Sequence, residues 1–398
     1  MRSAAAKLRS LYFRYRLRQT AVASDLKLRV TGVTSLDAAF AGAPLLARQT
    51  AMRWIGTKIP ERWLIYPGAA AEMALPKTIE TNDAGGFHAW RSIYRLPAYV
   101  YRIPQGLYHG EHGAAVDYQG CVFSDAVDAM PDQFLNLSPG DILPSKSQPH
   151  FCDGDAIALS SSKNYYHWLI KMVPRLHLVA QAGIDIARCE AILINQPTAA
   201  QREGYVEAGL RAEALKIVKS RHFWFCRNLY LPTVAHDVPP WAIDYLRRTF
   251  ARLMRGGSSG PRAVYLRRGT TRTRSVLNEE EVCEYLATCG VEAFQMNERS
   301  LAEQIGILAH ADLIIAPHGA ALSNLAFAKG SARCLEILAD SDAQKCYWIL
   351  AQHLRMNYHY FVAEKVYRTD GSEDFDMVIP IEKLKRALDF LLRDYSEA

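Results

Sequence analysis

The stretch "LIIAPHGAALSN" (residues 313–324) changes from a strand pattern to a helix pattern around a short Pro-His-Gly segment. Four apolar residues lead into that segment, as in a strand that is buried inside a parallel sheet. Leu322, Leu325 and Ala326 then recur at helical spacing. Free backbone N–H groups at the start of a helix attract anions, so the turn between a strand and a helix is where α/β proteins hold phosphates. The stretch therefore predicts an α/β fold with an anion site at this turn.

The sequence on both sides of this stretch alternates between strand and helix patterns. Strands are predicted over 263–269, 291–296, 312–317, 333–338 and 358–364. Helices are predicted over 239–254, 277–290, 300–311, 321–330, 346–356 and 381–395. The helix at 300–311 begins with Ser300 and Glu303 in the pattern of a capping box. This alternation favours a parallel, doubly wound sheet with right-handed crossovers.

The first half of the chain shows the alternation less clearly. Apolar spacing predicts a helix over 164–183 that is kinked at Pro174. Two predicted strands, over 191–196 and 215–218, flank a predicted helix over 200–209. A pair of strands is predicted over 223–233. Residues 30–110 have no clear pattern. We predict a basic N-terminal segment, two α/β domains and a C-terminal tail with a helix (1–30, 31–235, 236–365 and 366–398).

The composition is that of an ordinary soluble globular protein, with 49% hydrophobic residues and a formal net charge of +6. The eight cysteines form no C-x-x-C pair, so we expect reduced thiols in a cytosolic protein. The sequence has no apolar run of the roughly 20 residues that span a bilayer. It also has no recognised nucleic-acid-binding module, and we expect no nucleic-acid partner.

The N-terminal segment is basic, and Leu8, Leu11, Tyr12 and Tyr15 would share one face of a helix, opposite several arginines. One interpretation is a helix that lies on an anionic membrane surface. The others are a solvated basic tail and a helix docked on its own domain. We expect a cytoplasmic protein, and the first interpretation adds peripheral contact with the inner face of the membrane.

Charged side chains gather around the same predicted sheet edge. Arg267 and Arg268 end the strand at 263–269, and guanidinium groups suit phosphate oxygens. Arg272 and Arg274 follow in a polar loop, where solvated side chains are the alternative. Glu336 ends the strand after the turn, where a carboxylate can accept hydrogen bonds from ribose hydroxyls. An anion cradle beside a sugar-binding acid predicts a site for a nucleotide diphosphate.

Three blocks of the sequence, in this order, resemble glycosyltransferase family 61. They are "YYHWLIKMVPRL" (165–176), "VYLRRG…TRSVLNEEEV" (264–282) and "LAHADLIIAPHGAALSNLAFAKGSARCLEIL" (308–338). The family includes bacterial capsular-polysaccharide transferases, plant xylosyltransferases and animal protein O-linked N-acetylglucosamine transferases. The resemblance extends over about 115 to 365.

The resemblance implies a GT-B fold, in which two Rossmann-like doubly wound domains face a cleft, with the acceptor side at 31–235 and the nucleotide sugar at 236–365. It also implies inverting transfer without a bound metal ion. The donor-binding residues that we expect from it are Arg267, Arg274, His318, Gly319, Ala320, Ser323, Asn324 and Glu336. The family often has a second glycine where this chain has Ala321 and a threonine at position 323, and a proline commonly follows the strand-end acid.

An inverting transfer needs a base that takes the proton of the acceptor hydroxyl. His167 is the first candidate, because the resemblance places it on a helix that faces the cleft. The alternative for His167 is a histidine packed beside Trp168. Asp155 and Asp153 in the "CDGD" segment are the other candidates. This segment precedes an apolar run, which favours a turn over a metal-binding Asp-x-Asp motif.

The sequence thus predicts a metal-independent, cofactor-free, inverting glycosyltransferase, either a hexosyl- or a pentosyltransferase. Its donor would be a nucleotide-diphosphate sugar such as a UDP-sugar, and its acceptor a polysaccharide or glycolipid, as in capsular polysaccharide biosynthesis. Two alternatives stay open. One is a non-catalytic nucleotide- or sugar-binding scaffold of a polysaccharide assembly system, and the other is a phosphotransfer enzyme or epimerase on a similar frame.

Overall fold

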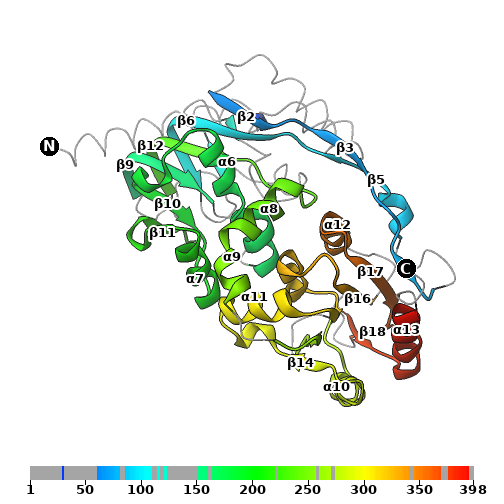
Figure 1. Cartoon of the computed structure of the whole chain (residues 1–398). Coiled ribbons are helices and arrows are strands. Elements are labelled where there is room, and N and C mark those ends of the chain that lie inside the picture. The colour runs from blue at the N-terminus through cyan, green and yellow to red at the C-terminus, as the bar shows by residue number, and fades with distance from the viewer. Residues whose placement is uncertain are drawn as a thin grey trace. The chain divides into compact units, whose positions relative to one another are not determined.

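The computed structural model describes the chain in stretches, which are residues 29–30, 61–80, 86–109, 114–116, 121–122, 150–159, 164–219, 223–256, 260–269, 274–339, 345–368 and 375–393. The chain divides into two compact units (Figure 1). The first unit comprises Met1–Ala69, Tyr94–Thr198 and Tyr205–His236, and the second comprises Ala70–Ile93, Ala199–Gly204 and Asp237–Ala398. Two early segments therefore belong to the unit that the second half of the chain forms.

The first unit contains a nine-stranded sheet with the order β1-β8-β7-β6-β12-β9-β10-β11, in which β2 also pairs with β6. The strands are β1 (Arg29–Val30), β2 (Arg62–Tyr66), β6 (Ala98–His109), β7 (Ala114–Val116), β8 (Cys121–Val122), β9 (His150–Ala158), β10 (Ala191–Ile194), β11 (Leu215–Ile217) and β12 (Phe223–Pro232). β12, β9, β10 and β11 run parallel, whereas β6 is antiparallel to β12, β2 and β7. The α/β class is confirmed. This sheet is mixed, however, and so departs from the predicted doubly wound parallel sheet. The antiparallel pairs involve β2 and β6, which lie in residues where the sequence shows no clear pattern.

Two local predictions for the first unit need correction. The predicted pair of strands over 223–233 is instead one long strand, β12 (Phe223–Pro232), which pairs with β6 on one side and β9 on the other. The helix predicted over 164–183 is interrupted, since a π-helix, η3 (His167–Met172), precedes Pro174 and the α-helix α6 (Arg175–Gln181) follows it. Proline lacks the N–H group that a continuous helix needs at this position, so the break is larger than the predicted kink. The remaining short helices are η4 (Ile186–Arg188) and η5 (Ala212–Ala214), and α7 (Ala199–Glu207) crosses the unit boundary.

The second unit contains a six-stranded sheet in the order β14-β13-β15-β16-β17-β4, and every pair in it is parallel. The strands are β4 (Lys77–Thr78), β13 (Ala263–Leu266), β14 (Glu292–Phe294), β15 (Leu313–Pro317), β16 (Arg333–Leu338) and β17 (Asn357–Val362). The predicted parallel sheet is confirmed. The edge strand β4 comes from the unassigned early region, and Thr78 Oγ1 donates to the carbonyl of Tyr360 (2.8 Å).

Helices cover both faces of this sheet. They are η1 (Phe87–Trp90), α8 (Pro240–Thr249), α9 (Ala251–Arg255), α10 (Glu279–Thr288), η6 (Met296–Glu298), α11 (Leu301–His310), η7 (Ala320–Phe327), α12 (Cys346–His353) and α13 (Ile381–Arg393). The predicted capping box of α11 is present, with Ser300 and Glu303 each bonded to the other's backbone N–H. Glu203 of α7 accepts from the next N–H groups of α11, at Leu301 and Ala302 (2.9 and 3.2 Å).

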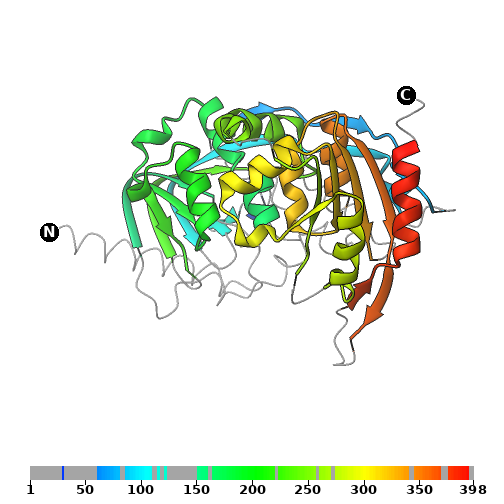
Figure 2. The same ribbon diagram turned by 60° about the horizontal axis from the view of Figure 1, so that its bottom comes forward.

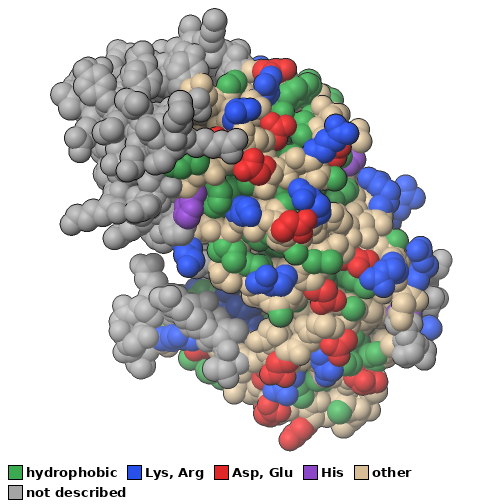
Figure 3. Space-filling view, turned by 90° about the vertical axis from the view of Figure 1, so that its left-hand side faces the viewer, with side chains coloured by type: hydrophobic (Ala, Val, Ile, Leu, Met, Phe, Trp, Pro, Cys, Tyr) green, Lys and Arg blue, Asp and Glu red, His purple; other side chains and the backbone are tan. Residues whose placement is uncertain are grey.

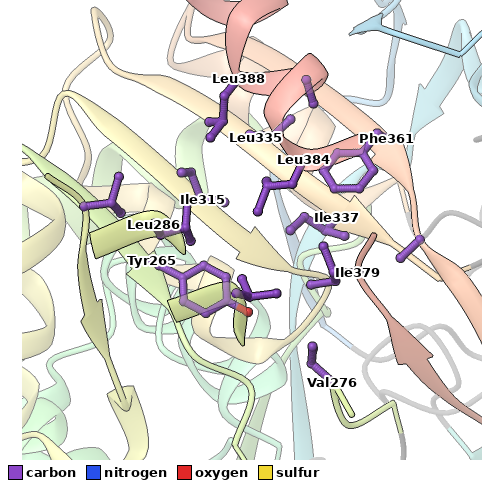
Figure 4. Packing of buried hydrophobic residues seen from close by; sticks show 14 of the residues in the cluster. Tyr265, Val276, Leu286, Ile315, Leu335, Ile337, Phe361, Ile379, Leu384 and Leu388 are labelled. Atoms are coloured by element: carbon purple, nitrogen blue, oxygen red, sulfur yellow. The ribbon is translucent and has the colours of Figure 1, made fainter. Parts of the chain in front are cut away.

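One apolar core lies between the sheet and the helices α10 and α13. Leu384 and Leu388 of α13 pack toward Ile315, Leu335 and Phe361 of the strands (Figure 4). Figure 2 shows α13, in red, alongside the strands of this sheet. Alternation along the strands thus buries one set of side chains in this core and leaves the residues at even positions, such as Ala316 and Glu336, for the opposite face.

Two short pairs complete the fold, β18 (Glu364–Tyr367) with β19 (Phe375–Val378) and β3 (Ala69–Glu72) with β5 (Ser92–Arg95). Basic and acidic side chains are interspersed over the described surface in Figure 3. None of the helices in the described stretches has the length and apolar character that a bilayer crossing requires. The basic N-terminal segment lies outside the described residues, apart from Arg29 and Val30.

Candidate functional site

The turn between β15 and η7 lies at the carboxyl end of the parallel strands. β15 ends at Pro317, and the backbone N–H of His318 donates to the carbonyl of Ile337 on β16 (2.8 Å). The sequence predicted a helix over 321–330, and the structure has a 3-10 helix over Ala320–Phe327. Ligands of open parallel sheets bind beyond this end of the strands. The turn therefore has the position of an anion site.

The guanidinium group of Arg268 lies against this turn. Its NH1 atom donates to the carbonyl of His318 (2.8 Å), and its Nε atom donates to the carbonyl of Arg274 (2.9 Å). A Cβ atom on Gly319 would overlap the NH1 atom. The backbone of Gly319 is extended (φ 176°), as any residue can be, so the contact requires the absent side chain and not a special backbone.

The positive charge of Arg268 is costly where it lies. Burial lowers the pKa of its guanidinium group to about 10, and the neighbouring Arg274 acts in the same direction. Its guanidinium group donates to the carbonyl oxygens of His318 and Arg274, and the charge of Glu279 acts in the opposite direction on its pKa. A phosphate anion at the turn would offset both the desolvation and the repulsion between the two arginines. The turn thus favours an anionic ligand.

Substitution of Gly319 by alanine separates the fit of this site from the stability of the fold. The added methyl group displaces the guanidinium group of Arg268, which is the movable end of a flexible side chain. We expect unchanged urea unfolding and an affinity for inorganic pyrophosphate that is lower by roughly tenfold, measured by calorimetry. Gly256→Ala is the matched control, since the nearest atom to its added Cβ is 3.3 Å away. Equal affinities of the two variants would contradict the role given to Gly319.

Arg267, which the resemblance places at the diphosphate, is paired with acids of α10. Its NH2 atom contacts Glu280, and its Nε atom lies 3.7 Å from a carboxylate oxygen of Glu279. The side chain retains 28% exposure. Its role in donor binding stays a prediction, and Arg268 is the residue of this pair that contacts the turn.

Glu279 fixes the backbone from which Arg268 extends. One of its carboxylate oxygens accepts from the N–H of Arg268 (2.6 Å) and the other from the N–H of Gly269 (2.8 Å). The hydroxyl of Tyr265 also donates to Glu279 (3.2 Å). The sequence patterns did not single out this buried acid. Its contacts make it a supporting residue of the site.

Glu336 is fully buried, and within the described residues the hydrogen bonds of its carboxylate go to two side chains. Its Oε1 atom lies 2.5 Å from Nδ1 of His318, and its Oε2 atom accepts from the hydroxyl of Tyr358. The ring of His318 also packs against that of Tyr347 on α12, with 5.1 Å between the ring centroids. Both carboxylate oxygens are therefore engaged inside the second unit, which favours an action through His318 over direct contact with ribose.

The other residues predicted to bind the donor are buried or bonded to neighbouring segments of the second unit. Ser323 and Asn324 are fully buried in η7, and the Asn324 amide donates to the side chain of Gln304 on α11 (3.2 Å). Arg274 has a positive φ of 60°, and its N–H donates to the carbonyl of Phe375 (2.7 Å). The structure thus brings His318, Gly319 and Ala320 together with Arg268, Arg274 and Glu336. Arg272 lies outside the described residues.

The candidates for the catalytic base belong to the first unit. His167 is half-buried at the start of η3, where its ring meets the ring of Tyr166 edge-on (5.4 Å). Asp155 accepts a hydrogen bond from the amide of Asn228 (2.8 Å). Their roles stay predictions.

The turn predicted for the "DGD" segment is wrong. Asp153 and Asp155 lie within β9, and the pairing of β9 with β12 shifts register between Cys226 and Asn228 of β12. Across the described stretches, no group of three or more His, Cys, Asp or Glu residues has the arrangement of a metal site.

Comparison with protein families defines the class of this protein as a glycosyltransferase. Residues 165–335 match the family described as Glycosyltransferase 61. The resemblance drawn from the three sequence blocks is therefore confirmed over these residues, which are somewhat less than half of the chain. The match includes His167, Arg268 and the turn at His318, and it ends one residue before Glu336. A search of the curated proteins gives no match.

Proposed function

We propose that the protein transfers a sugar, with inversion, from a nucleotide-diphosphate donor such as a UDP-sugar to a polysaccharide or glycolipid acceptor. The observation that carries this proposal is the contact of Arg268 with the turn of His318 and Gly319 at the carboxyl end of parallel strands. A cation and backbone N–H groups at one point suit the two phosphates of such a donor.

The same groups account for transfer without a metal ion. Negative charge develops on the diphosphate as its bond to the sugar breaks, and donors already in place stabilise this charge. Arg268 and the N–H groups of the turn supply that stabilisation in the proposal. An acceptor hydroxyl attacks from the other side while a base, with His167 and Asp155 as candidates, removes its proton.

The wider setting is also part of the proposal. We propose a GT-B arrangement in which residues 236–365 bind the donor, a hexose or pentose as the transferred sugar, and a role in capsular polysaccharide biosynthesis. The place of action would be the cytoplasm, with the basic N-terminal segment on the inner face of the membrane. The family resemblance supports the GT-B arrangement, the transferred sugar and the role in capsular polysaccharide biosynthesis. The positive charge before Asp25 supports the contact with the membrane.

A panel of nucleoside diphosphates and nucleotide sugars tests the proposal. A ligand at 100 times its dissociation constant stabilises a protein by about 2.7 kcal/mol, so at least one member should raise the melting temperature clearly. With that donor, we expect transfer to a glycan or glycolipid acceptor to persist in EDTA. The absence of any stabilisation would contradict the proposal, and loss of transfer in EDTA that manganese restores would contradict its metal-free form. Binding without turnover would favour the non-catalytic scaffold.

A further inference from the structure

A row of three polar side chains crosses three neighbouring strands of the second sheet. In the parallel register, Ala316 of β15 pairs with Glu336 of β16, and Cys334 of β16 pairs with Tyr358 of β17. Side chains two residues apart point to the same face of a sheet. Glu336, Tyr358 and His318, which follows two residues after Ala316, therefore share a face, and their contacts are a consequence of the register.

The hydrogen bonds in this row have a defined direction. Burial raises the pKa of Tyr358 well above its usual value, and the Glu336 carboxylate acts in the same direction, so the hydroxyl keeps its proton and donates it to Oε2. A buried carboxylate is stabilised by donors at both oxygens. Nδ1 of His318 lies 2.5 Å from Oε1, and we assign it as the second donor. The proton of the ring is thus placed on Nδ1, and Nε2 is the nitrogen left to meet a ligand.

We propose that Glu336 and Tyr358 are positioning residues, which hold His318 so that its Nε2 atom contacts a phosphoryl oxygen of the nucleotide diphosphate. The inference rests on the proposed function, because it assigns the ligand of the same turn. His318 lies beside Gly319 and is bonded through its carbonyl to Arg268, so a phosphate at this turn is close to the imidazole ring.

In the proposed complex the imidazole takes up a second proton, at Nε2, from water and donates it in a hydrogen bond to the phosphoryl oxygen, while the Glu336 carboxylate faces the ring at Nδ1. When the bond between the anomeric carbon and the phosphate oxygen breaks, the electron pair stays on that oxygen, and the hydrogen bond from Nε2 strengthens as the negative charge grows. A carboxylate that orients an imidazole and stabilises its charged form acts in the same way in other enzymes. Glu336 thus acts through His318, and Tyr358 acts through Glu336.

Two substitutions of nearly unchanged shape test the row. Tyr358→Phe removes one hydroxyl and keeps the ring that packs against Phe87. Glu336→Gln leaves a single carbonyl oxygen, which Tyr358 takes, so that an amide N–H group faces Nδ1. Tyr360→Phe is the matched control, since Tyr360 lies on the same face of β17 and the side-chain hydrogen bonds of Glu336 within the described residues go to His318 and Tyr358.

The first measurement is calorimetric binding of inorganic pyrophosphate and of UDP to the purified full-length variants. We expect affinity to fall about fivefold in Tyr358→Phe and about 30-fold in Glu336→Gln, and to change less than twofold, roughly, in Tyr360→Phe. Urea unfolding of each variant shows whether it is folded. A folded Glu336→Gln variant that binds pyrophosphate like the parent chain would overturn the proposal.

The second measurement is independent of any ligand. Histidine ring ¹⁵N spectra of the unliganded protein, with the His318 signals assigned by their absence in His318→Gln, should show the proton on Nδ1. In Glu336→Gln the proton should move to Nε2. If the His318 signals are the same in Glu336→Gln as in the parent chain, the proposed positioning of His318 by Glu336 is wrong. A parent chain that shows the expected pattern and loses it in Glu336→Gln, yet binds neither pyrophosphate nor UDP, would instead overturn the proposed function and the phosphate contact with it.

Discussion

Arg268→Ala should lower the affinity of the chain for a nucleoside diphosphate by about 100-fold. Removal of one partner of a desolvated charge pair costs roughly 2–5 kcal/mol, and 1.4 kcal/mol corresponds to a factor of ten. Arg268 also donates to the carbonyls of His318 and Arg274, so its loss frees both segments that border the turn. Calorimetry with UDP measures the change, and the same loss should follow in kcat/KM once a donor is known.

Arg267→Ala is the matched comparison for this prediction, because the two arginines are adjacent in sequence. The guanidinium group of Arg267 is paired with Glu280 and is partly exposed. Exposed ion pairs contribute roughly 0–1 kcal/mol, so we expect a loss of at most about fivefold. A larger loss in Arg267→Ala than in Arg268→Ala would show that the residue implied by the family resemblance binds the diphosphate, and would exclude the assignment made from the contacts.

Trp348→Ala should produce the largest loss of stability. Trp348 is fully buried on α12, its indole N–H donates to the carbonyl of Ala74 (2.9 Å), and Phe87 meets its ring edge-on (5.2 Å). Replacement of a buried tryptophan by alanine typically costs about 3–5 kcal/mol, because the cavity cannot close completely. Urea unfolding followed by tryptophan-independent circular dichroism measures the cost.

Trp348→Phe separates ring packing from the hydrogen bond to Ala74. Phenylalanine retains most of the contact with Phe87 and removes the indole N–H that donates to the carbonyl of Ala74, so we expect a loss of about 0.5–1.5 kcal/mol. If the alanine variant unfolds at the same urea concentration as the parent chain, the early segment around Ala74 and Phe87 does not contribute to the core of the second unit in solution.

The sequence predicted most of the second unit, because its parallel strands are short apolar runs and its helices have clear ends. The turn at His318 could be predicted for the same reason. Arg268 could have been found by alternation, since Tyr265 pairs with Ile315, and residues at positions 266 and 268 then share the face of Ala316 and His318. The sequence pattern did not show which face of the second sheet the ligand would meet, and so it did not distinguish Arg267 from Arg268.

The remainder depended on contacts between distant residues. Tyr358 lies in a strand that has an apolar pattern, and its bond to Glu336 requires the register of β16 with β17. The mixed sheet of the first unit depends on β2, β6 and β7, where polar and apolar residues show no clean alternation. The register shift in β9 likewise follows from its pairing with β12 and has no marker in the "DGD" letters.

The position of strand β4 in the sequence affects how the second unit can fold during translation. Lys77 and Thr78 emerge early, yet their hydrogen-bonding partner β17 is made almost three hundred residues later (His359 and Tyr360). The partners of two nearby residues are also synthesised late: Glu80 pairs with Lys383, and Phe87 packs against Tyr360. Nascent chains must therefore keep this segment uncommitted until translation is nearly complete, and a fragment that starts at Asp237 would leave the outer rim of β17 bare and open to pairing with another chain.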